Sequence, residues 1–227
     1  MPIARGNDMK GYTIFYVTAG LAFLLLLALD VSGLVRTFLK AIPVSTLTVL
    51  VLREMRGFPR IGLAGALIGS VCGDVLLDLP QEGLFIFGLV SFLLGHLFYT
   101  TLFFRYARRP DRFSILIIVG LGAFAVFMMW LFRNIDPGLY PPVVLYIVVI
   151  IAMSIGALLV PAANRLLFWG ALLFILSDVV LAVNKFLVTI PNGRLINITL
   201  YFTAQYLIIV AARSIWRRDA GAGRVSP

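Results

Sequence analysis

Apolar residues form long runs along the whole chain, separated by short segments rich in charged and turn-forming residues. Most runs are close to the ~20 residues that a helix needs to cross the hydrocarbon core of a bilayer. The second run is the shortest, and it contains Lys40 and Pro43. The pattern predicts about eight transmembrane helices, at roughly 13–33, 37–52, 61–79, 84–104, 113–132, 142–160, 166–186 and 195–213.

The composition leaves no room for a separate water-soluble domain. Hydrophobic residues make up 61% of the 227 positions and charged residues 13%, against roughly 25% charged residues in soluble domains. We expect an all-α, polytopic membrane helix bundle, with a single eight-helix transmembrane domain over residues 1–213 and a short basic cytoplasmic tail over 214–227. Arg5 and Lys10 precede the first apolar run, but the run is longer than that of a signal peptide, so we expect it to be retained as a helix.

The positive charge is distributed unevenly between the two sides of the predicted bundle. Arginines concentrate at residues 53–60, 105–112 and 213–224, whereas the alternate connections carry few basic residues, although the net charge is +9. Lys and Arg accumulate in cytoplasmic loops of membrane proteins. The asymmetry predicts that both termini are cytoplasmic. If the protein is bacterial, we expect it in the inner membrane. The same asymmetry explains the net positive charge without a nucleic-acid partner.

Two aspartates lie deep inside predicted spans. Asp74 and Asp178 are each well inside a different apolar run, and Asp78 follows Asp74 by one helical turn. A charged side chain at this depth costs ~3 kcal/mol on insertion scales, so such residues usually face a bundle interior and serve a function. The structural alternative is that Asp178 pairs with Lys185, two turns along the same face, while Asp74 bonds to its neighbours.

Other polar side chains share faces of predicted helices. His96 and Tyr99 are three residues apart on the fourth span. His96 is the single histidine of the sequence, so the composition argues against a multi-histidine metal site. We therefore expect neither a metal nor another cofactor, although Asp74, Asp178 and His96 together form a conceivable ligand set. The eighth span carries two polar stripes, which fit interhelical hydrogen bonding and the lining of a polar cavity equally well: Asn197, Tyr201 and Gln205, and Thr199, Thr203 and Tyr206.

Small residues recur at four-residue spacing in the third span. Gly65, Gly69 and Gly73 form a continuous Gly-x-x-x-Gly pattern that ends next to Asp74. Such a pattern allows a second helix to approach closely. The predicted contact is a packing feature, but it determines where the Asp74 carboxyl group points.

Three blocks of sequence form a recognisable set: Gly73-Asp74 with Gly88, Phe92, Gly95, His96, Leu97 and Tyr99; Leu173–Asp178 with its continuation Leu181–Phe186; and Tyr201–Ile208. Together they resemble the lysoplasmalogenase family, also called the YhhN-like membrane family. The similarity covers roughly residues 73–104 and 170–212 and is weaker at Lys40 and Pro43. It implies an integral membrane enzyme that hydrolyses the vinyl-ether bond of lysoplasmalogens, with membrane lipids around it and a lysophospholipid as substrate.

The chemistry implied by this resemblance suits two carboxyl groups in a dry cavity. A vinyl ether is cleaved after protonation of an alkene carbon, which requires a general acid and a second group that stabilises the cation and orients water. Two neighbouring carboxyl groups resist double ionisation and share a proton. We assign Asp74 and Asp178 as the catalytic residues, with a preference for Asp74 as acid and Asp178 as base because Lys185 lies near Asp178 in the sequence.

Further polar residues are candidates for contacts with the substrate. Lys40, Lys185 and Arg194 lie on the predicted outer side, where cations would bind the substrate phosphate. The remaining candidates are polar groups able to orient water or the head group, and they are Asp78, His96, Tyr99, Asn184, Gln205 and Tyr206.

Two function classes other than an enzyme remain open from the sequence. A proton-coupled transporter also uses buried acids, and a lipid-binding membrane protein without turnover needs a similar cavity. An intramembrane aspartyl protease is disfavoured because position 71 is Val, which leaves the Gly-x-Gly-Asp motif incomplete.

Overall fold

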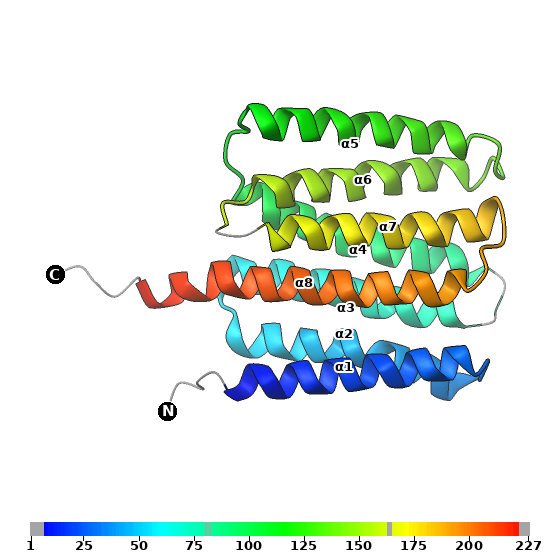
Figure 1. The fold of residues 1–227 in the computed structure, drawn as a ribbon, viewed down its shortest axis with the longest axis horizontal. Coiled ribbons are helices and arrows are strands. Elements are labelled where there is room, and N and C mark those ends of the chain that lie inside the picture. Colours follow the sequence, from blue (N-terminus) through cyan, green and yellow to red (C-terminus); the bar gives the residue numbers. More distant parts are fainter. Residues whose placement is uncertain (1–6, 80, 82, 163–164, 223–227) are drawn as a thin grey trace.

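The computed structural model describes residues 7–79, 81, 83–162 and 165–222. Within these residues the regular secondary structure consists of α-helices (Figure 1). Eight helices follow one another along the chain. They are α1 (Asn7–Ala28), α2 (Leu34–Glu54), α3 (Gly57–Asp78), α4 (Leu84–Arg105), α5 (Arg112–Leu131), α6 (Tyr140–Leu159), α7 (Leu166–Phe186) and α8 (Gly193–Ala222).

All eight helices are long and apolar enough to cross a membrane, which confirms the predicted polytopic bundle. The boundaries differ mainly at the first connection. Asp30, with φ of 53°, and Gly33, with φ of 111°, turn the chain after α1, so α2 begins at Leu34 and reaches 21 residues despite the internal Pro43. The second span is therefore longer than expected.

The last helix also extends beyond its predicted end. α8 continues past residue 213 to Ala222, although its candidate membrane span ends at Arg217. Part of the predicted basic tail is therefore helical. Arg5 and residues 223–227 lie outside the described residues.

The helices run side by side along one direction, and α1 and α5 occupy opposite edges of the bundle (Figure 1). The most extensive contacts join α3 to α4 and α7 to α8, followed by α4 with α6 and α2 with α3. α1 begins and α8 ends at the same end of the bundle, which we call the terminal end. The opposite, distal end carries the α1–α2, α3–α4, α5–α6 and α7–α8 connections.

The close approach of a second helix, which the Gly-x-x-x-Gly pattern predicts, occurs between α3 and α4. A Cβ atom on Gly69 would lie 2.8 Å from the Ser91 carbonyl oxygen and 2.9 Å from the Gly95 nitrogen. A Cβ atom on Gly95 would in turn lie 2.8 Å from the Ala66 carbonyl oxygen. Because backbone faces backbone at this crossing, side chains cannot give way, and the register of Asp74 relative to α4 is closely determined.

Replacing Gly69 by Val should weaken this crossing by about 1–3 kcal/mol, the usual cost of overpacking. The expected result is a lower unfolding temperature of the purified protein in detergent. Gly120→Val is the matched control, because a Cβ atom on Gly120 in α5 meets nothing within 4 Å. Equal unfolding temperatures for Gly69→Val and the wild type would contradict the proposed packing.

The orientation of the bundle stays a prediction, and the charge asymmetry makes it testable. In a Cys72→Ser background, Asn134→Cys places a thiol in the α5–α6 connection and Arg108→Cys places one in the α4–α5 connection. We expect a membrane-impermeant maleimide to label Asn134→Cys in intact cells and Arg108→Cys only after permeabilisation. The opposite labelling pattern would place the termini outside the cytoplasm.

Candidate active site

Asp74 from α3 and Asp178 from α7 line the same cavity, which we call the polar cavity. It has a volume of about 210 Å³ and lies in the distal half of the bundle. Five helices contribute to its walls. The lining residues are Lys40, Asp74, Leu77, Phe92, Ser177, Asp178, Leu181, Asn184, Lys185, Gly193, Arg194, Asn197, Ile198 and Tyr201.

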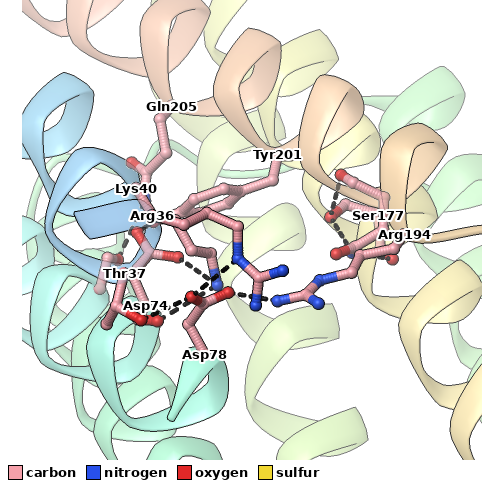
Figure 2. Close-up of polar contacts among 11 residues, drawn as sticks. Arg36, Thr37, Lys40, Asp74, Asp78, Ser177, Arg194, Tyr201 and Gln205 are labelled. Atoms are coloured by element: carbon pink, nitrogen blue, oxygen red, sulfur yellow. Dashed lines mark hydrogen bonds and ion pairs between the residues drawn. The ribbon is translucent and has the colours of Figure 1, made fainter. Parts of the chain in front are cut away.

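Asp74 has a cation and a hydroxyl donor beside it (Figure 2). Asp74 is buried, with 1% of its surface exposed. Oδ2 accepts a hydrogen bond of 2.7 Å from the Tyr201 hydroxyl, and Oδ1 lies 3.2 Å from Lys40 Nζ. Lys40 Nζ also donates to the Asp74 carbonyl oxygen at 3.2 Å. The ammonium and the hydroxyl together stabilise a negative charge on this carboxyl group.

Asp178 lies among neutral groups. Its Oδ2 accepts a hydrogen bond of 2.7 Å from the Tyr146 hydroxyl, and His96 Nε2 is 3.9 Å away. The pair with Lys185, which was the structural alternative to a functional role, does not occur among the described residues, and Lys185 Nζ instead lies 5.1 Å from the centre of the Phe85 ring. This position corrects the sequence argument, which used Lys185 to favour a charged Asp178.

The hydrogen bonding of His96 determines which of its nitrogens faces Asp178. Nδ1 lies 2.6 Å from the Phe92 carbonyl oxygen, and a carbonyl can only accept, so Nδ1 carries the hydrogen. Nε2 of the neutral ring is then a bare acceptor, and it is buried without a hydrogen-bond donor among the described residues. An anionic Asp178 carboxylate next to this nitrogen lone pair is unfavourable. Asp178 and His96 together therefore favour binding one proton between them.

Asp78 is the centre of a separate charged cluster at the distal end. Its Oδ2 accepts from the Thr37 hydroxyl at 2.7 Å and from Arg36 Nε at 3.4 Å, and its Oδ1 pairs with Arg194. Figure 2 shows the guanidinium groups of Arg36 and Arg194 next to each other, and both are paired with the Asp78 carboxylate. The Arg194 side chain is 45% exposed and lines the polar cavity. Asp78 therefore holds Arg194 in place, and its own oxygens are already occupied.

Five of the predicted substrate-binding residues are not part of the lining of the polar cavity, and they are Asp78, His96, Tyr99, Gln205 and Tyr206. The buried Tyr99 hydroxyl donates to Gln205 Oε1 at 2.7 Å, and Gln205 Nε2 donates to Ser70 Oγ at 2.9 Å. Tyr206 shares a hydrogen bond of 2.9 Å with Thr13 of α1. These contacts are the interhelical hydrogen bonding that the α8 stripes also allowed, and they join α8 to α3, α4 and α1.

The α7–α8 hairpin positions the remaining polar residues of the cavity. Asn197 Nδ2 donates to the Ser177 carbonyl oxygen and to Ser177 Oγ, both at 2.8 Å. Asn184 Oδ1 accepts from the Ile190 amide at 2.9 Å and so orders the turn between the helices. Asn184 and Lys185 both line the cavity, as their candidate role in substrate binding requires.

Sequence reasoning missed three residues that contact the acids, namely Arg36, Thr37 and Tyr146, and it noted Tyr201 only as part of a polar stripe. Arg36 and Thr37 bind Asp78, Tyr201 binds Asp74, and Tyr146 binds Asp178. Arg36 precedes Lys40 by four residues, a spacing that places both cations on one face of α2 and could have indicated a paired acid. For Tyr146 the available signal was a lone hydroxyl in the otherwise apolar middle of the sixth span.

No group of three His, Cys, Asp or Glu side chains that could hold a metal ion occurs in the described part of the chain. The conceivable ligand set of Asp74, Asp178 and His96 does not form such a group.

Comparisons with known proteins agree with the motifs. The family model described as the YhhN family matches residues 35–212. Lysoplasmalogenase TMEM86B of Sus scrofa is 31% identical over 200 residues, 88% of this chain and 84% of that protein. The Mus musculus protein of the same name is 30% identical over 199 residues, 87% of this chain and 84% of the relative.

A bacterial relative is also similar over part of the chain. Lysoplasmalogenase of Mycobacterium bovis is 33% identical over 136 residues, which cover 58% of this chain and 52% of that protein. No solved structure matches the chain. Because the family match extends from α2 to α8 and the relatives align with most of the sequence, the chain belongs to the YhhN family.

Proposed function

We propose that this protein is a membrane hydrolase that cleaves the vinyl-ether bond of lysoplasmalogens, releasing a fatty aldehyde and the glycerophospho head group. The observation that carries the proposal is the pair of acids on one cavity, with a lysine beside Asp74 and only neutral partners beside Asp178. The curated relatives named lysoplasmalogenase support the same substrate class.

The reaction needs one proton donor and one water molecule. Protonation of the outer alkene carbon breaks the C=C π bond and leaves an oxocarbenium ion across the inner carbon and the ether oxygen. Water adds to the inner carbon and loses a proton, which gives a hemiacetal. Breaking the bond between that carbon and the ether oxygen then yields the aldehyde and the glycerol hydroxyl, and the acid regains its proton.

Asp178 is the better candidate for the general acid. A buried carboxyl group without a cation favours its protonated form, and the neutral surroundings of Asp178 are Tyr146 and the bare Nε2 of His96. Asp74, next to Lys40 and Tyr201, suits the role of an anion that stabilises the oxocarbenium ion and accepts a proton from water. These roles reverse the preference drawn from the sequence.

Cations at the distal side of the cavity suit the substrate phosphate. Arg194 and Lys185 line the cavity, and a guanidinium group binds a phosphate through two parallel hydrogen bonds. Asp78 pairs with Arg194 and is itself held by Arg36, which limits the freedom that Arg194 loses on binding. A lysolipid in this orientation presents its ether bond to the two acids farther inside.

Asp74→Asn and Asp178→Asn should each reduce kcat about 100-fold or more, because each change removes a group that donates, accepts or stabilises charge in the reaction. The measurement is aldehyde release from a lysoplasmalogen by the purified variants. Asp136→Asn is the control, since Asp136 is an exposed acid in the α5–α6 connection.

The same assay separates the enzyme from the alternatives. A proton-coupled transporter or a lipid-binding protein releases no aldehyde with the wild type. If both asparagine variants stay folded and keep near-normal rates, the assignment of the two acids is wrong.

Arg194→Gln should lower kcat/KM about 10-fold or more through an increase in KM, because a charged hydrogen-bond donor to the phosphate is lost. The loss should disappear with an alkenyl glycerol that has no phosphate. Arg133→Gln is the matched control, since Arg133 is at the same end of the bundle but lies over the Trp130 ring. An equal loss with both substrates would show that Arg194 does not recognise phosphate.

A further inference from the structure

A second cavity lies between α4, α5, α6 and α7, and we call it the apolar cavity. It has a volume of about 70 Å³. Tyr146 and Asp178 are its polar residues among those described, and the rest of its wall is aliphatic, aromatic or Met. Representative lining residues are Leu89, Met128, Val143, Ile147, Val179 and Ala182.

The apolar cavity and the polar cavity meet at two residues, because Asp178 and Leu181 line both. On one side of Asp178 lie Lys40, Asp74 and Arg194. On the other side the Tyr146 hydroxyl, which donates to Asp178 at 2.7 Å, belongs to the wall of the apolar cavity. The acid therefore stands at a boundary between charged and hydrocarbon surroundings.

We propose that the apolar cavity binds the alkenyl chain of the lysolipid, with the vinyl-ether carbons beside Asp178 and the head group in the polar cavity. The inference rests on the proposed function and specifies how the substrate lies in the site. A lysoplasmalogen has the same order of polarity, with a phosphate at one end, hydrocarbon at the other and the reacting bond between them. Burial of the chain on the apolar side removes hydrocarbon from water and from charged groups.

The cavity must widen to take a whole chain. A volume of about 70 Å³ is less than half of the roughly 150 Å³ cavity that takes up benzene, so it has room only for the first carbons. α5 supplies one wall through Phe124 and Met128, and it lies at the edge of the bundle with its main contacts to α6 (Figure 1). Outward displacement of α5 is the change that lengthens the cavity with least loss of packing.

A photoreactive lipid tests the chain site without requiring turnover. The probe is a saturated 1-O-alkyl lysophospholipid with a diazirine in the chain near the ether, since it lacks the alkene that is protonated in the reaction. We expect irradiation of the full-length protein in nanodiscs to label α5, α6 and α7 at cavity residues such as Met128, Val143 and Val179, and the same saturated alkyl lysophospholipid without the diazirine to compete. Labelling confined to the outer surface of the bundle, or insensitive to competition, would overturn the inference.

A pair of substitutions tests the same site through kinetics. Ala182→Phe fills the apolar cavity one helical turn beyond Asp178, and we expect it to remove the competed label and lower kcat/KM about 10-fold or more. Ala123→Phe makes the same change at an exposed position of α5 and should leave both unchanged. If Ala182→Phe is folded and retains wild-type labelling and kinetics, the chain does not occupy this cavity.

The two readouts separate this inference from the proposed function. Competed labelling of the apolar cavity in a protein that releases no aldehyde would support the chain site and reject the hydrolase. Normal aldehyde release with labelling elsewhere would support the hydrolase and reject the chain site.

Discussion

The distal half of the bundle depends on pairing charges that the bilayer would otherwise exclude. Lys40 of α2 lies beside Asp74 of α3, and Asp78 pairs with both Arg36 of α2 and Arg194 of α8. An unpaired charge in such surroundings is costly, and removal of one partner from a buried pair typically costs about 3–5 kcal/mol. These pairs therefore hold α2, α3 and α8 in a common register, and the polar cavity forms on the α7 side of that unit.

Asp178 differs from the other acids because its partners carry no formal charge in the neutral state of His96. Tyr146 and His96 come from α6 and α4, so the acid connects the charged unit with the apolar helices. One site thereby contains two carboxyl groups in contrasting environments, which is the condition for dividing acid and base roles between them. The contact of Asp178 with both cavities follows from the same location.

Much of the fold could be predicted because a membrane permits few solutions. Apolar run length and the need to satisfy backbone hydrogen bonds within each span lead directly to helices. The glycine pattern correctly indicated that another helix packs closely on α3, but not that this helix is α4. The ends of α1 and α8 were less predictable, since the turn at Asp30 and Gly33 and the extension of α8 to Ala222 depend on local conformation rather than hydropathy. The candidate acids were found because buried charge is rare.

The sequence by itself determined the class of protein, the number of spans, the family resemblance and the two deep aspartates, because each depends on composition or on short motifs. Only the tertiary structure decided which side chains meet. Helical periodicity allowed Asp178 to pair with Lys185, but Lys185 lies over Phe85, and Lys40 lies beside Asp74 instead. Contacts between helices distant in the chain depend on their rotation and packing, which no single span encodes.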